Sequence, residues 1–319
     1  MDFFSGNPST NKLSLGVNEE DVLKAIANSG YPLQNIISEQ LKEFKVTEEW
    51  SFVDRDTLDL RNIDILAELD LYNHNDYPDT KVRPGLSLLI ECKQTSLPYV
   101  FFATNNIPYM PHFPMYSGLR ENDYIDIKSD NTRDTWSFSI NHIFNLQQHE
   151  FVSNAPLYSK VFSKCVRKGK EIELSGSDTY NSVILPLTKA LAHYSNVVVP
   201  PKTAQYFDCY MTLGVAIIDG PMIGVKVKEE VNNINYVPWV RVLRHEHEEG
   251  ESNYIKGKHY VIDVVHKDFF NTYIDQHLIP FANNFGKLAL KHARVLASGK
   301  GTIKGMAKNP WSDLEQRLL

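Results

Sequence analysis

The chain has few cysteines and no long apolar run. Its 319 residues contain three cysteines, Cys92, Cys165 and Cys209, whose spacing fits no Cys-x-x-Cys motif. The sequence therefore predicts no disulfide framework and a reducing, cytoplasmic location. No stretch approaches the ~20 apolar residues that span a bilayer. Residues 1–6 also lack the basic-then-apolar pattern of a signal peptide, so we expect no membrane partner.

Excess positive charge and the common catalytic motifs are also missing. The formal net charge is −6, and the 42% hydrophobic and 23% charged content is ordinary for a globular protein. The acidic total does not favour nucleic-acid binding, although the local distribution of charge decides this. There is no Gly-x-Ser-x-Gly, P-loop or Gly-x-Gly-x-x-Gly motif. These absences argue against a serine hydrolase, a P-loop NTPase and a dinucleotide-dependent enzyme.

What the chain does contain is charge inside apolar runs. Residues 61–67 carry Asp64, and residues 88–94 carry Glu91 and Lys93. Side chains alternate along a strand, so Glu91 and Lys93 point the same way. Their apolar neighbours are typical of a sheet buried on both faces, where an unpaired carboxylate is costly or shifts its pKa. Two carboxylates that converge on a divalent cation, beside a lysine that orients or activates water, would explain the pattern.

The apolar periodicity predicts a mixed α/β order. We expect helices at residues 32–44, 144–165, 181–193 and 267–278, the last extending toward residue 296. We expect strands at residues 45–54, 60–72, 86–94, 206–219, 222–227, 239–244 and 259–265. The later strands are expected to join the earlier ones in one extended mixed sheet.

The order helix, strand, strand, strand, with Asp64 and Glu91-Cys92-Lys93 on the last two strands, resembles the PD-(D/E)XK superfamily of restriction-endonuclease-like nucleases. The resemblance covers residues 20–102. It implies an α/β fold with a mixed central sheet flanked by helices, a large insertion after the third strand, and extra C-terminal strands and a helix. Residues 1–18 are then an arm, and residues 19–319 a single domain. Within that domain we expect a core at 19–102 and 179–219, an insertion at 103–178 and an extension at 220–319.

Three acids compete to be the partner of Glu91. Pro78-Asp79 is a literal Pro-Asp pair, but its Asn/Asp/Pro-rich surroundings predict a hairpin tip. If residues 72 and 86 face each other in an antiparallel pair, Asp64 lies opposite residue 94, close to Glu91 and Lys93. We therefore assign Asp64, with Asp70 and Asp79 as alternatives.

Many members of the superfamily also carry an acid on the first helix. Gln34 stands at the matching position here and departs from that pattern. It could hold a metal-bound water but adds no charge. Glu39 and Glu43 are alternatives that are more typical of a solvated helix face.

The resemblance implies a specific site. Asp64, Glu91 and the carbonyl of Cys92 would hold Mg²⁺ or Mn²⁺, while the Cys92 side chain faces the other side of the sheet. Lys93 would orient the attacking water or stabilise the charge on phosphorus, and Gln94 would contact the scissile phosphate or a metal-bound water.

The implied function is a metal-dependent nuclease that hydrolyses phosphodiester bonds, of DNA rather than RNA, and leaves a 5′-phosphate. Restriction or anti-phage defence is the expected setting. Cleavage of both strands favours a homodimer, and a partner protein of a defence system is an alternative. Two other interpretations stay open. One is a catalytically inactive nucleic-acid-binding or scaffold protein of the same fold, and the other is a buried Asp64–Lys93 ion pair without metal.

Two basic segments could contact phosphates or be solvated surface. Residues 276–312 contain no acid, and their cations are Lys287, Lys291, Arg294, Lys300, Lys304 and Lys308. Residues 160–170 carry Lys160, Lys164, Arg167, Lys168 and Lys170. A His-x-His pair, His245 and His247, lies among acids, and its spacing fits a charged hairpin loop better than a structural zinc site.

Overall fold

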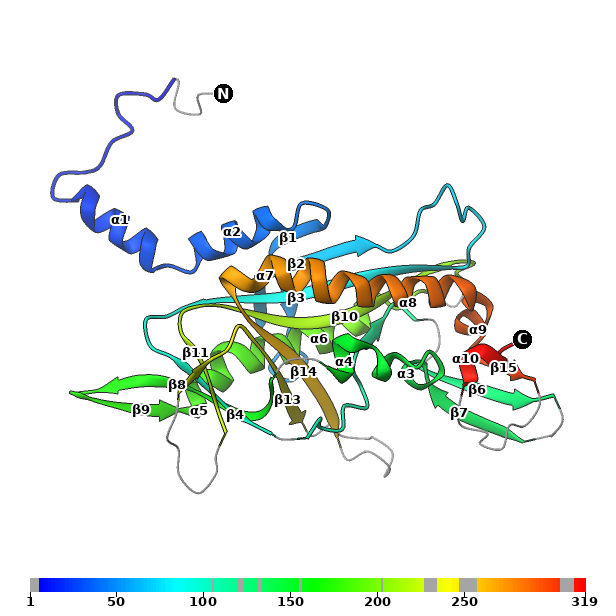
Figure 1. Cartoon of the computed structure of the whole chain (residues 1–319). Helices are drawn as coiled ribbons and strands as arrows, with labels where there is room; N and C mark the ends of the chain where they lie inside the picture. Colours follow the sequence, from blue (N-terminus) through cyan, green and yellow to red (C-terminus); the bar gives the residue numbers. More distant parts are fainter. Residues whose placement is uncertain are drawn as a thin grey trace.

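The computed structural model describes residues 6–104, 106–119, 123–130, 134–154, 157–201, 203–226, 234–246, 257–304 and 313–319. In these residues the chain forms a mixed α/β fold with a 12-stranded sheet and a separate three-stranded sheet (Figure 1). Along its main path the large sheet contains β1 (Lys45–Val53), β2 (Leu60–Asp70), β3 (Val82–Gln94), β10 (Phe207–Asp219), β14 (Lys258–His266), β13 (Trp239–Glu246), β8 (Leu157–Lys168), β4 (Tyr99–Ala103), β11 (Met222–Val225) and β12 (Asn235–Tyr236). Two further strands attach to it, β5 (Met115–Ser117) on β10 and β9 (Glu171–Ser175) on β8.

The centre of the sheet is parallel. Strand β10 runs parallel to β3 from Phe207 opposite Val82 to Asp219 opposite Gln94, and β14 continues in parallel on its other side. These strands are buried along nearly their whole length, which explains their continuous apolar sequences. The prediction that the strands of both halves join one extended mixed sheet is confirmed.

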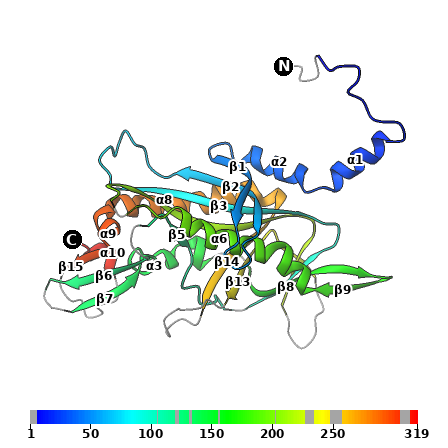
Figure 2. The ribbon, with the colours of Figure 1, turned by 180° about the vertical axis from the view of Figure 1, so that it is seen from behind.

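Helices cover both faces of this sheet (Figures 1 and 2). On one face α2 (Tyr31–Gln40) packs against β2 and β3, and α8 (Ile279–Lys291) packs against β3. On the other face α6 (Leu185–Val197) packs against β1, β2, β3 and β10. Pro186 lies in the first turn of α6, where proline is tolerated, after a π-helical turn at Tyr180–Ile184.

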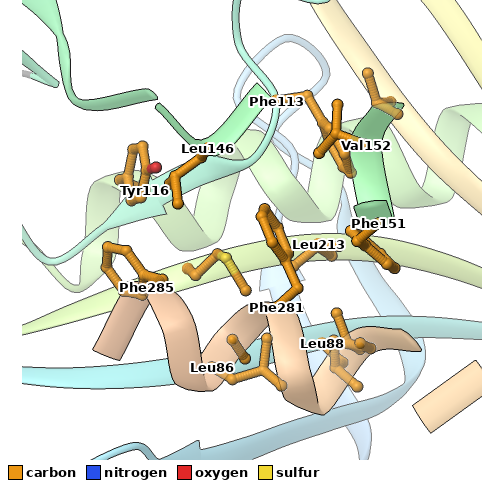
Figure 3. Close-up of a cluster of buried hydrophobic side chains, with 14 of the residues drawn as sticks. Leu86, Leu88, Phe113, Tyr116, Leu146, Phe151, Val152, Leu213, Phe281 and Phe285 are labelled. Atoms are coloured by element: carbon orange, nitrogen blue, oxygen red, sulfur yellow. The ribbon is translucent and has the colours of Figure 1, made fainter. Parts of the chain in front are cut away.

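Aromatic side chains fill the space under α8 (Figure 3). Phe281 and Phe285 of α8 are completely buried and belong to the same hydrophobic cluster as Leu86 and Leu88 of β3. Phe151 stacks on Phe281 with ring centroids 4.8 Å apart. The segment after β4 therefore supplies part of the main core.

That segment contradicts one prediction. Residues 144–165 are not one helix: α3 (Ile140–Ile143), a 3₁₀ turn at Leu146–Gln148 and α4 (Glu150–Ser153) are short, and β8 follows. The prediction was wrong because the apolar residues of β8 are aromatic and β-branched, which favours a strand once the sheet offers a partner.

The remaining elements are a small second sheet and further helices and turns. The small sheet joins β15 (Lys300–Ile303), β6 (Tyr124–Ser129) and β7 (Thr135–Ser139). The other helices are α1 (Glu19–Asn28), α5 (Gly176–Thr179), a 3₁₀ turn at Lys267–Phe269, α7 (Phe270–Thr272), a π-helical turn at Tyr273–Leu278, α9 (Ala293–Ser298) and α10 (Leu314–Arg317). Helix α1 buries no residue. Within the described part of the chain, no helix is long and apolar enough to cross a membrane.

Candidate active site

The candidate site lies where β2 and β3 separate. Their antiparallel ladder extends to Ile65 opposite Ile90. Just beyond this pair, the backbone N–H of Cys92 donates to Oδ2 of Asp64 at 2.6 Å. A side-chain carboxylate thus takes a position that a strand carbonyl would occupy in a continued ladder. The divergence of the two strands brings Asp64 beside the end of β3.

The register differs from the sequence prediction. With Ile65 opposite Ile90, continuation of the ladder places Asp64 opposite Glu91, whereas residue 94 was expected there. The three-residue error arose because Asp70 pairs with Gly85, whereas the prediction placed residue 72 opposite residue 86. An odd shift exchanges the two faces of a strand, so the expected register would have put Asp64 on the wrong face. The observed one puts it on the face of Glu91.

Glu91 and Lys93 form an ion pair on this face. The Nζ of Lys93 donates to Oε1 of Glu91, whose side chain is 7% exposed. The other oxygen, Oε2, is buried and has no hydrogen-bond partner among the described residues. Lys93 therefore pairs with Glu91 and not with Asp64, contrary to the ion-pair interpretation.

The two carboxylates are difficult to ionise. Burial raises the pKa of Glu91 to about 7, although the ammonium of Lys93 opposes this and the charge of Asp64 adds to it. Burial also raises the pKa of Asp64, against the stabilising N–H of Cys92. Burial alone would lower the pKa of Lys93, but the carboxylate of Glu91 outweighs it and raises that pKa. Lys93 is therefore an ammonium ion, in a site where negative charge is crowded.

Gln34 reaches the site from α2. Its side chain is buried, and its Nε2 donates to the backbone carbonyl of Asp64 at 3.0 Å. The bond fixes the strand backbone that carries Asp64. The structure thus brings this predicted residue to the site in a positioning contact.

Cys92 lies between Glu91 and Lys93 in β3, and Gln94 follows Lys93. The Cys92 thiol is buried in the cluster under α2 and α8, and burial raises its pKa, so it is a core thiol as expected. The N–H and C=O of a strand residue leave on the same edge, so the Cys92 carbonyl is directed toward Asp64. Gln94 is exposed at the end of β3, opposite Asp219.

The rejected acids lie elsewhere. Asp70 is exposed and pairs with Gly85, six residues away from Asp64 along β2. Asp79 is exposed in the connection between β2 and β3, as the hairpin-tip prediction stated. Glu39 and Glu43 are also exposed. Asp70 and Asp79 therefore do not replace Asp64, and Glu39 and Glu43, the alternatives to Gln34, are solvated.

Sequence reasoning missed two neighbours of the site. Glu49 of β1 has a positive φ of 49°, and Nδ2 of Asn62 donates to its carboxylate at 3.3 Å. Its charge contributes to the raised pKa of both Asp64 and Glu91. Tyr99, at the start of β4, is 1% exposed and couples electrostatically with Lys93. A left-handed residue inside a strand leaves no sequence signal when it is not glycine or asparagine.

The other predicted clusters do not converge here. Among the described residues, no three His, Cys, Asp or Glu side chains are grouped so that they could hold a metal ion. His245 lies in β13, and His247 falls outside the described residues. In the acid-free run Lys291 pairs with Glu315 at 2.6 Å, and Lys308 also falls outside them.

No family model, curated protein or solved structure matches this chain.

Proposed function

We propose that the protein is a metal-dependent nuclease with a restriction-endonuclease-like core, formed by α2, β1, β2, β3, α6 and β10. The observation that carries the proposal is the pairing of a buried carboxylate, Glu91, with a half-buried one, Asp64, at a strand divergence, where Glu91 keeps an unsatisfied oxygen. Glu91 Oε2 has no hydrogen-bond partner in the described structure, and such a group is costly unless a ligand satisfies it. Asp64 lies beside it, held by the Cys92 amide.

The donor set fits Mg²⁺ or Mn²⁺. All the donors are oxygens: the carboxylates of Asp64 and Glu91 and the carbonyl of Cys92. Mg²⁺ usually binds one or two carboxylates and completes its octahedron with waters and phosphate oxygens, so a third protein carboxylate is not required. A bound divalent cation supplies charge neutralisation at the phosphate and a more acidic water. It would also relieve the crowding of negative charge that raises the pKa of Glu91.

Lys93, Gln34 and Gln94 would orient groups in the site and stabilise the charge that develops on phosphate. The raised pKa of Lys93 keeps it protonated, which favours stabilisation of the charge that develops on phosphate over proton abstraction. Gln34 holds the backbone of Asp64, and thereby the carboxylate, in place. Gln94 is exposed at the end of β3, directly after Lys93, and would contact a phosphate or a water as the resemblance implies. Hydrolysis would leave a 5′-phosphate, as in the superfamily that the motif resembles.

A cleavage assay tests this proposal. Supercoiled plasmid, single-stranded DNA and RNA are incubated with Mg²⁺, Mn²⁺ or EDTA. We expect metal-dependent cleavage of DNA that falls by about 10²–10³-fold or more in Glu91→Gln and Asp64→Asn, because each substitution weakens a ligand of the metal ion that would neutralise the reacting phosphate. Asp79→Asn is the matched control: it removes the exposed acid of the Pro-Asp pair and should keep full activity. Unchanged cleavage by Glu91→Gln would contradict the proposal.

One observation favours the alternative of a catalytically inactive nucleic-acid-binding protein. Helix α2 offers Gln34, whose amide nitrogen is bound to the backbone, where many members of the superfamily that the motif resembles carry an acid. Absence of both cleavage and metal binding would support that alternative. Restriction or anti-phage defence is the setting we propose for an active nuclease, and cutting of both strands would favour a homodimer.

A further inference from the structure

A two-stranded ribbon projects from the molecule near the candidate site. It consists of residues 164–175: the end of β8, the turn at Gly169 and Lys170, and β9. In both views it extends away from the body of the protein (Figures 1 and 2). Strand β8 pairs with β4 up to Lys164 opposite Tyr99, and from Lys164 to Lys168 it pairs with β9.

The tip of the ribbon is basic. Arg167, Lys168, Gly169 and Lys170 are consecutive and exposed, so three of four residues are cations. Gly169 has a φ of +64° and permits the tight turn. Of the two acids in β9, Glu173 pairs with Lys168 at 3.3 Å. The tip therefore presents a net positive charge, although the whole chain is acidic.

The base of the ribbon adjoins the candidate site. The Nζ of Lys164 lies 5.8 Å from the centre of the Tyr99 ring, and Tyr99 couples electrostatically with Lys93. The four residue-to-residue steps from Lys164 to Lys168 span about 13 Å at ~3.3 Å per residue. At 3.4 Å per base pair, the tip would lie roughly four base pairs from a phosphate bound at the site.

We propose that this ribbon enters the major groove of B-form DNA roughly four base pairs from the scissile phosphate, which would make duplex DNA the substrate. This inference rests on the proposed nuclease function. The major groove, about 12 Å wide, admits a two-stranded ribbon, while the narrow major groove of A-form RNA does not. Tip cations would neutralise phosphates. Ile172 and Leu174, 56% and 50% exposed, offer apolar surface for thymine methyl groups.

Binding measured in EDTA tests the ribbon without cleavage. Fluorescence anisotropy measures the affinity of the protein for a labelled DNA duplex of about 30 base pairs over a range of salt concentrations. The triple variant Arg167→Ser, Lys168→Ser and Lys170→Ser should bind at least tenfold more weakly. Its slope of log K against log salt should be less steep by about 2–3, since each lost phosphate contact removes about 0.9. The control variant replaces three exposed lysines that lie far before the ribbon in the sequence, Lys12, Lys24 and Lys42, with serine. It should bind the duplex like the wild type.

Several results would overturn the inference. One is an equal loss of duplex affinity in the control variant, and another is a duplex affinity unchanged by the ribbon substitutions. The others are no duplex binding by the wild type, and ribbon-dependent binding of duplex RNA or of single strands that is as tight as the binding of duplex DNA. Metal-dependent cleavage with a ribbon variant of normal affinity would reject the ribbon and keep the nuclease. Ribbon-dependent duplex binding without any cleavage would reject the nuclease and keep the ribbon. Thermal unfolding of each variant checks that the fold persists.

Discussion

Two ion pairs in the same sheet, Arg241–Asp263 and Glu91–Lys93, differ in how many of their polar atoms have hydrogen-bond partners. Arg241 of β13 and Asp263 of β14 are both fully buried. Arg241 donates to both oxygens of Asp263, at 2.7 and 3.0 Å, and the hydroxyl of Tyr273 adds a bond of 2.9 Å. A further Arg241 N–H donates to the carbonyl of Phe151 at 2.7 Å. Both oxygens of Asp263 therefore have hydrogen-bond partners. We call such a pair closed, and its geometry is typical of a structural ion pair.

The Glu91–Lys93 pair is open, by which we mean that one of its carboxylate oxygens lacks a hydrogen-bond partner among the described residues. Glu91 leaves Oε2 without a hydrogen-bond partner in the described residues, a second carboxylate lies beside it, and the Lys93 side chain is 28% exposed. The comparison shows that a charge in an apolar strand does not by itself identify a site. An unsatisfied acceptor beside a like charge, at a point where strands separate, is the more specific sign. Asp263 has no lysine at the spacing that separates Lys93 from Glu91.

The largest expected effect is on stability at the closed pair. Asp263→Asn leaves the guanidinium of Arg241 buried without its counterion, which should cost about 3–5 kcal/mol of the free energy of unfolding. Glu91→Gln removes a charge that burial already penalises, so it should not destabilise the protein at pH 8. Urea unfolding of both variants measures the difference. Equal destabilisation by the two substitutions would remove the distinction between the pairs.

The second effect depends on pH. The folded state raises the pKa of Glu91 from its ordinary 4.5 to about 7, so it binds this proton more tightly than the unfolded state does. Stability from this group is therefore present below pH 4.5 and is lost as the pH rises to about 7. Relative to wild type, Glu91→Gln should gain stability over that interval, by at most about 3 kcal/mol. Unfolding at several pH values tests this, and a difference that stays constant with pH would contradict it.

The smallest effect concerns Gln34. Gln34→Ala removes one buried hydrogen bond to the Asp64 carbonyl, which should cost about 1–3 kcal/mol of stability. By loosening Asp64 it should also weaken Mn²⁺ binding by about 10–100-fold, as loss of an outer-sphere contact does in other metal sites. Gln40→Ala, at the exposed end of the same helix, is the control. A Gln34→Ala protein with normal Mn²⁺ affinity would show that Gln34 has only a structural role.

Much of the fold was accessible from local pattern. The strand predicted at 206–219 matches β10, that at 259–265 lies within β14, and the predicted helix at 32–44 overlaps α2. Continuous apolar runs and turn formers carry this information within a few residues. The strand pair with Asp64 and Glu91 was also recognisable, because embedded charge is conspicuous in such runs.

Contacts between distant segments were less accessible. The register of β2 on β3 depends on where the hairpin begins, and an error of a few residues at each end changed the face of Asp64. The strand β8 was mistaken for a helix because two of its three partners, β4 and β13, lie far away in sequence. The bond from Gln34 to the Asp64 backbone and the positive φ of Glu49 are tertiary features that neither periodicity nor composition encodes.

Mn²⁺ titration by isothermal calorimetry at pH 8 tests the central claim most directly, because it asks whether the open pair is a metal site. Wild-type protein should bind the ion, Asp64→Asn and Glu91→Gln should each lose that binding, and Asp79→Asn should retain it. Binding should also weaken as the pH falls below about 7, where a proton competes for Glu91. Wild-type protein that binds no Mn²⁺, or Glu91→Gln that binds it as tightly as wild type, would contradict the claim.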